Sequence, residues 1–126
     1  MQMGLLVKTN LNIMKINKGI ADHKKGDTWD GIEIIATTQD AMGAIEPINL
    51  TGATILAEFK ISNGKVAFKF ETSDNSIIVS EPLLGKIVFA PKKIEYPENT
   101  YYFDVQITYP DNKVETIIPT HSWTIY

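Results

Sequence analysis

The chain has 126 residues, which is enough for one domain with one hydrophobic core and short for two. Its 44% hydrophobic and 21% charged residues are typical of soluble globular proteins and argue against disorder over most of the length. The net charge of -3 gives no electrostatic reason to expect nucleic acid or an anionic membrane as a partner, and the lack of cysteine excludes disulfides, thiolate metal sites and cysteine nucleophiles.

The elements predicted along the chain are almost all strands. Residues 1–10 are expected to form a flexible N-terminal arm, and residues 11–126 a single β-sandwich domain. Short apolar or alternating runs separated by polar turn residues indicate the strands. They cover residues 11–17, 29–37, 53–61, 65–71, 76–80, 85–90, 101–109, 113–118 and 121–126. The prediction is therefore an all-β fold, an Ig-like antiparallel β-sandwich of about seven to nine short strands.

The clearest strand begins at Tyr101 and alternates strictly. Tyr101, Phe103 and Tyr109 share one face, which we assign to the core, while Tyr102 and Asp104 point the other way. A second alternating strand, residues 53–61, places Glu58 and Lys60 on its outer face in the same manner.

The segments between the strands are predicted from their turn residues. Ser62-Asn63-Gly64-Lys65 and Pro110-Asp111-Asn112-Lys113 are expected to be tight hairpin turns. Residues 39–50, with a glycine and a proline, indicate a long loop or an irregular edge. Residues 91–97 have a proline at each end, which allows at most a short helical turn.

Catalytic and cofactor motifs are lacking in the sequence. No glycine-rich phosphate loop or nucleophile elbow is present, so we expect a non-enzymatic protein without a cofactor. His23 and His121 are far apart in sequence, and we interpret both as surface or strand-end residues, although a metal site could use the two histidines with a carboxylate such as Asp22 or Asp27. Two carboxylate pairs beside loops are interpreted as solvated: Asp27 with Asp30, and Glu95 with Glu98.

Three segments together resemble a family of phage proteins. They are Gly26-Asp27-Thr28-Trp29, then Asn49-Leu50-Thr51-Gly52-Ala53-Thr54, and finally Tyr101 to Thr108 followed by the turn at Asp111-Asn112. This order is similar to the small β-sandwich domains of tailed bacteriophages, notably the N-terminal domain of BppU-type upper baseplate proteins and related tail or neck proteins. The resemblance covers roughly residues 26–126, and its motifs are turn residues and strand faces.

The resemblance implies a structural or adaptor protein of a virion. Its expected partners are other virion proteins and further copies of the chain, without nucleic acid or membrane, and its expected location is the virion after synthesis in the bacterial cytoplasm. We expect exposed strand edges and loops to make these contacts. The candidate interaction residues are Tyr102, Asp104, Glu58, Lys60, Gln39, Asp40, Met42 and Glu46.

The aromatic residues leave a second function open. Exposed rings suit sugar stacking as well as protein contacts, so a carbohydrate-binding module that recognises a host surface glycan is the alternative. We interpret Trp29 and Trp123 as core residues, since a tryptophan within a strand of a sandwich usually packs inside.

Overall fold

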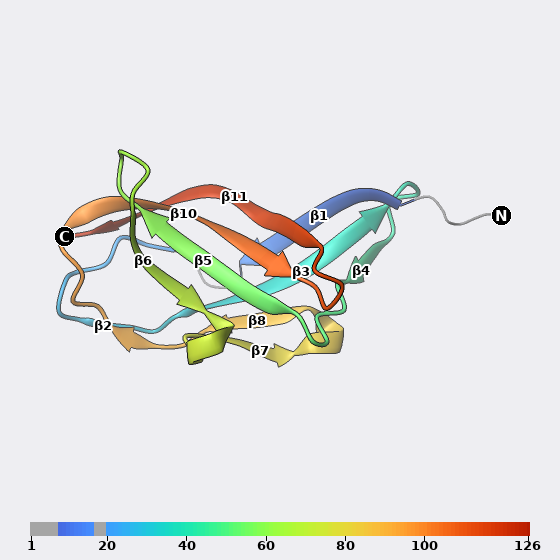
Figure 1. Ribbon diagram of the computed structural model, residues 1–126, viewed down its shortest axis with the longest axis horizontal. Coiled ribbons are helices and arrows are strands. Elements are labelled where there is room, and N and C mark those ends of the chain that lie inside the picture. The colour runs from blue at the N-terminus through green and yellow to red at the C-terminus, as the bar shows by residue number, and fades with distance from the viewer. Residues whose placement is uncertain (1–7, 17–19) are drawn as a thin grey trace.

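The computed structural model describes residues 8–16 and 20–126, which form eleven strands and two short 3-10 turns (Figure 1). The strands are β1 (Lys8–Ile16), β2 (Thr28–Trp29), β3 (Ile32–Asp40), β4 (Ile45–Pro47), β5 (Thr54–Lys60), β6 (Val66–Glu71), β7 (Ile77–Glu81), β8 (Lys86–Phe89), β9 (Lys92–Lys93), β10 (Asn99–Thr108) and β11 (Val114–Ile125). The 3-10 turns are η1 (Thr72–Asp74) and η2 (Pro82–Leu84). Within these residues no helix is long and apolar enough to cross a membrane.

Nine of the strands form two antiparallel sheets that pack face to face, and β2 and β9 pair as a separate two-stranded sheet (Figure 1). The first has the order β1-β3-β8-β7, with β4 also paired to β3, and the second has the order β11-β10-β5-β6. If β1, β3, β5, β6, β7, β8, β10 and β11 are lettered A, B, C, C′, D, E, F and G, the sheets read A-B-E-D and G-F-C-C′. This is the Greek-key order of immunoglobulin-like domains, so the predicted fold class is confirmed.

The segment that follows β1 connects the two sheets at one edge. β1 pairs with β3 from Lys8 opposite Asp40 to Ile16 opposite Ile34. Farther along, His23 makes a parallel bridge with Ile125 of β11 in the other sheet. Of the predicted N-terminal arm, residues 1–7 lie outside the described residues, and residues 8–10 belong to β1.

The core lies between the sheets and is rich in aromatic side chains. Trp29 and Trp123 are 7% and 1% exposed, with ring centroids 4.9 Å apart, which confirms their predicted burial. Phe59 of β5 stacks on Phe103 of β10 at 4.6 Å. Each fully buried apolar side chain of this size contributes about 1.5–3 kcal/mol to the stability of the sandwich.

Tyr101 fixes the corner between the two sheets at the start of β10. Its ring is buried, as predicted, and its hydroxyl donates a hydrogen bond to the Pro97 carbonyl oxygen. Burial raises the pKa of the Tyr101 hydroxyl above its usual value. A tyrosine in this place, bonded to the backbone a few residues upstream, is a hallmark of Greek-key sandwiches.

Three hairpin turns share one geometry. In residues 40–43, 61–64 and 109–112, the N–H of the fourth residue donates to the carbonyl of the first. The fourth residue is Gly43, Gly64 or Asn112, and its φ is +88°, +85° or +69° respectively. Glycine and asparagine tolerate this left-handed conformation better than other residues do. Both hairpin turns predicted from the sequence are confirmed, and the third lies in the segment predicted as a long loop or an irregular edge.

Two segments between the predicted strands contain further short strands. Residues 91–97 do not form a helical turn, because Lys92 and Lys93 extend as β9 and pair with β2. Residues 39–50, predicted as a long loop or an irregular edge, form the end of β3, the turn at Gly43 and the three-residue strand β4, which pairs with β3 off the main strand order.

Two predicted strand boundaries also differ. The strand predicted at residues 29–37 is divided into β2 and β3 at Gly31, whose φ is +81°. The runs at 113–118 and 121–126 join into the single strand β11, whose register against β10 shifts on both sides of Val105.

Candidate interaction surface

The predicted residues of β5 and β10 lie side by side on the outer face of the second sheet. In the antiparallel register Tyr102 is opposite Lys60. Asp104 is opposite Glu58 in the same pairing. Tyr102 keeps 40% of its surface exposed and the other three are half-buried. The structure therefore brings these four side chains together, and their role in binding stays a prediction.

Charges on this face are of mixed sign. Glu58 lies between Asp104 on one neighbouring strand and Lys69 on the other, so it meets both a like and an opposite charge. Lys69 Nζ is also 3.1 Å from Glu71 Oε2. Exposed ion pairs of this kind contribute about 0–1 kcal/mol each, so the face has the character of a solvated sheet surface.

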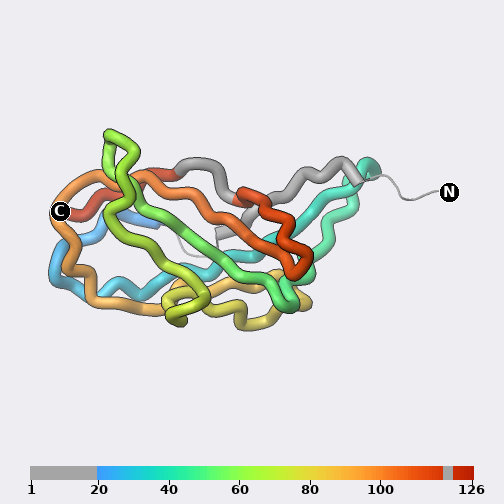
Figure 2. Tube along the Cα trace, viewed as in Figure 1, coloured from blue at the N-terminus to red at the C-terminus, as the bar shows by residue number. Residues whose placement is uncertain are grey.

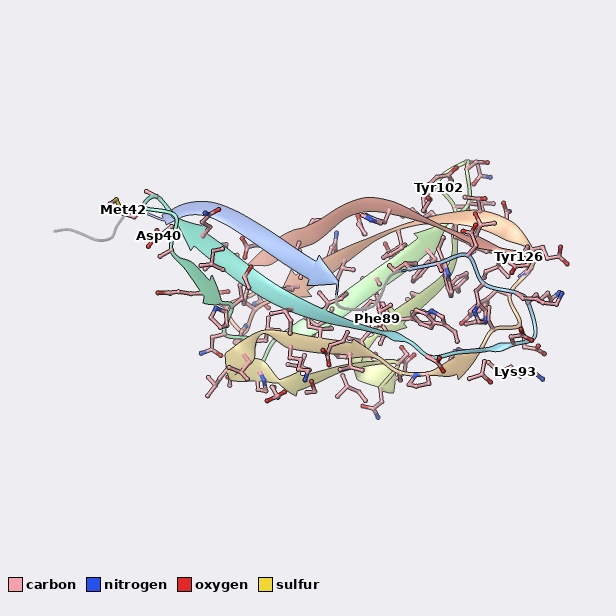
Figure 3. All side chains as sticks on the ribbon, turned by 180° about the vertical axis from the view of Figure 1, so that it is seen from behind. Asp40, Met42, Phe89, Lys93, Tyr102 and Tyr126 are labelled. Carbon is pink, nitrogen blue, oxygen red and sulfur yellow. The ribbon has the colours of Figure 1, made fainter. Side chains whose placement is uncertain are left out.

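The other predicted residues belong to the β3–β4 hairpin: Gln39, Asp40, Met42 and Glu46. Asp40 Oδ1 accepts hydrogen bonds from the N–H groups of Met42 and Ala44, both at 2.9 Å, and these bonds hold the turn. Met42 at the tip is 92% exposed. Figure 3 shows Met42 and Tyr102 toward opposite ends of the molecule, so the predicted residues form two separate surfaces.

Sequence reasoning missed four exposed apolar side chains at the end of the sandwich that carries this hairpin. We call the five residues there the apolar hairpin end: Met42 (92% exposed), Leu83 (70%), Ile45 (61%), Val114 (55%) and Leu84 (52%). Figure 2 shows the β3–β4 turn and η2 at this end, and the β5–β6 turn and the C-terminal residue at the other.

Close contacts connect η2 and the β10–β11 turn to the segment that precedes β5. The Leu50 N–H donates to the carbonyl of Pro82, the first residue of η2, at 2.9 Å. Gly52 packs so closely on Pro110 of the β10–β11 turn that an added Cβ would lie 2.9 Å from its ring. A signal for this surface was present in the sequence, since two adjacent leucines stand in a turn where polar residues are usual.

The histidines do not come together in a metal site. His23 Nε2 is 2.9 Å from the Asp27 carbonyl oxygen, and His121 lies beside the Phe103 ring with centroids 6.1 Å apart. Among the residues that the structure describes, no group of three or more His, Asp or Glu side chains could hold a metal ion.

The perturbed ionisable groups support local structure. The Ser76 hydroxyl, bonded to Asp74, lowers the pKa of that carboxyl below its usual 3.8. Hydrogen bonds to Glu81 and Glu33 raise the pKa of Lys86, whose Nζ lies 3.0 and 3.2 Å from their carboxylates. None of these groups belongs to either predicted surface.

Most rings that motivated a sugar-binding platform face the core. Trp29, Trp123 and Tyr101 are buried, and Tyr96 stacks on Phe68 with centroids 3.7 Å apart. Tyr102 and Tyr126, by contrast, are 40% and 58% exposed. A stacking platform would therefore depend mainly on these two exposed tyrosines.

The comparisons with known proteins add little to this picture. No protein-family model matches the chain, and no curated protein sequence matches it. Among solved structures, the crystal structure of CopC from Methylosinus trichosporium OB3b is similar with a TM-score of 0.47. The two chains are 7% identical over 90% of this chain and 92% of that one. A likeness of this degree supports no statement about function.

Proposed function

We propose that this chain is a non-enzymatic structural or adaptor protein of a phage virion, in the baseplate, tail or neck, and that it acts by protein–protein assembly. Its partners in this proposal are other virion proteins and further copies of itself. The phage setting rests on the resemblance of residues 26–126 to BppU-type N-terminal domains. The observation that best supports an assembly role is the apolar hairpin end.

The energetic argument concerns water-exposed apolar surface. Exposed apolar side chains that adjoin one another mark contact surfaces more often than isolated ones do. Burying a leucine fully against a partner gains about 1.5–3 kcal/mol, which corresponds to at least a tenfold change in affinity. Leu83 and Leu84 are adjacent in η2 and more than half exposed, so together they would be a substantial part of such a contact.

Association measured by light scattering and native mass spectrometry across a range of concentrations tests the proposal. The wild-type chain should form a discrete oligomer or bind a purified virion protein encoded beside it. The double variant Leu83→Ser/Leu84→Ser should weaken this association at least tenfold. The matched control Val66→Ser/Ile78→Ser removes two exposed apolar side chains from strands and should leave it unchanged.

Two results would count against the proposal in different ways. A chain that stays monomeric and binds none of those proteins, or equal losses in both double variants, would refute the assembly role at this surface. If the chain associates but mass spectrometry does not detect it in purified phage particles, the virion setting fails and the assembly role stands. A saturable response on a glycan array would instead favour carbohydrate recognition.

A further inference from the structure

A pocket of about 230 Å³ opens in the segment between β1 and β3, away from the apolar hairpin end. Its lining includes Asp22, His23, Thr28, Trp29, Asp30 and Gly31. The volume lies just below the range of roughly 300–1,000 Å³ that is usual for small-molecule sites. It therefore suits a single side chain or a ligand of a few heavy atoms.

The walls of this pocket are fixed before any ligand arrives. The His23 N–H donates to the Thr124 carbonyl at 2.9 Å, and the His23 carbonyl accepts from the Tyr126 N–H at 3.0 Å. Thr28 and Trp29 pair as β2 with the two residues of β9.

The floor of the pocket is equally rigid. Trp29 is held among core rings, with the Trp123 ring centroid 4.9 Å away. A Cβ on Gly31 would lie 2.0 Å from the Phe89 carbonyl oxygen, so the backbone there has no room to shift inward. A preformed site binds without an ordering cost.

The polar groups around the pocket are mainly acceptors. No hydrogen bond or ion pair from another described residue engages the carboxylate of Asp22 or Asp30. His23 Nε2 donates its proton to the Asp27 carbonyl oxygen at 2.9 Å, because a carbonyl oxygen can only accept. The Thr28 hydroxyl can accept as well. A ligand with several N–H donors and a positive charge complements this lining.

A metal ion fits these residues less well than an organic cation does. A divalent cation needs several converging ligands, and no trio of His, Asp or Glu with that geometry exists in the described chain. An ammonium or guanidinium group can be held by two carboxylates and neutral acceptors, with its apolar stem against the Trp29 ring.

We propose that this pocket binds an alkylammonium or guanidinium group. The group comes either from a lysine or arginine side chain of an assembly partner or from a small free amine. The first source rests on the proposed function, whereas the second does not. The pocket and the apolar hairpin end then recognise different chemistry at different places on one domain.

A two-dimensional NMR titration of the full chain tests this inference. The probes are Nα-acetyl-lysine methylamide, which presents the side chain in a peptide setting, and n-butylamine as a free amine. Nα-acetyl-norleucine methylamide is the uncharged control for the first probe. Both cations should cause saturable shifts at Thr28, Gly31 and the Trp29 indole N–H, and the norleucine probe should not.

Variants that each remove one negative charge test whether the cation binds in this pocket. Asp22→Asn and Asp30→Asn should each weaken binding about two- to fivefold, as expected for exposed carboxylates. Asp27→Asn makes the same change on the same segment without altering the pocket lining, and it should leave the affinity unchanged. Tighter binding of the lysine probe than of n-butylamine would assign a partner side chain as the source, and the reverse would assign a free amine.

The inference is overturned if neither cation gives saturable shifts, or if Asp27→Asn weakens binding as much as the other two variants do. This outcome is distinct from failure of the proposed function, because association is measured separately by light scattering. The pocket can bind amines in a chain that does not assemble, and the chain can assemble with an empty pocket.

Discussion

Replacing Gly85 with alanine should destabilise the fold much more than replacing Gly64, although both glycines have a positive φ. Gly85 follows η2 with φ +67°, and Gly64 closes the β5–β6 turn with φ +85°. A left-handed conformation costs an alanine about 1–2 kcal/mol. At Gly64 an added Cβ has no atom within 4 Å, so this backbone cost is the whole expected loss.

At Gly85 a steric cost adds to the backbone cost. The new Cβ would lie 2.3 Å from the Ala36 carbonyl oxygen and 3.2 Å from that of Ile48. Relief of this clash moves Gly85 away from β3 and breaks the 2.8 Å hydrogen bond from the Ala36 N–H to the Gly85 carbonyl. A buried group left without its partner costs about 1–3 kcal/mol, so the sum for Gly85→Ala is about 2–5 kcal/mol.

Equilibrium urea unfolding of the two variants and the wild type measures both losses. Gly85→Ala should lower the midpoint more than Gly64→Ala at an unchanged slope, with a difference of about 1–3 kcal/mol in the free energy of unfolding. Equal losses in the two variants would show that β3 yields to the new Cβ without cost, and the steric reasoning would be wrong. A smaller loss of unfolding free energy in Gly85→Ala than in Gly64→Ala would refute the steric reasoning more strongly.

Two further predictions concern turns. Asn112 has φ +69°, a left-handed conformation that glycine adopts without strain and alanine does not. Asn112→Gly should therefore keep or raise the thermal midpoint, and Asn112→Ala should lower the free energy of unfolding by about 1 kcal/mol. An alanine variant as stable as the wild type would contradict this prediction. The Asp74 carboxyl has a pKa below 3.8 in the folded chain, so its bond to Ser76 stabilises the fold above that pH, and the contribution is lost as the pH falls through the lowered pKa. Asp74→Asn should flatten that part of the stability–pH profile, and an unchanged profile would rule out the contribution.

The sheet faces could be predicted from the sequence because alternation is a local property. Tyr101 and Phe103 face the core and Tyr102 faces solvent, as period two requires. The turn at residues 61–64 could be predicted for the same reason, since Gly64 supplies the positive φ within four residues. Features of this kind depend on neighbours in the chain.

Features that depend on distant parts of the chain were missed. β9 exists because residues 92–93 meet residues 28–29, which lie far away in sequence. Period-two patterns likewise cannot tell that Met42 and Tyr102 lie toward opposite ends, because this follows from the order of strands in the two sheets. Gly85, which directly follows η2, lies against the backbone of Ala36 through another non-local contact.

The most exposed apolar side chains and the carboxylates of the pocket lie toward the ends of the sandwich rather than on the outer faces of its sheets. On the outer faces, charged side chains neutralise one another, as Lys86 does with Glu33 and Glu81. The apolar hairpin end and the pocket beside β2 lie instead in turns, short strands and strand ends, where a rigid sandwich presents groups that have no partner among the described residues. Because these two surfaces differ in chemistry and are separated by the core, occupation of one does not block the other. The proposed adaptor role would use this separation to connect two partners at once, and variants at each surface should therefore be assayed independently.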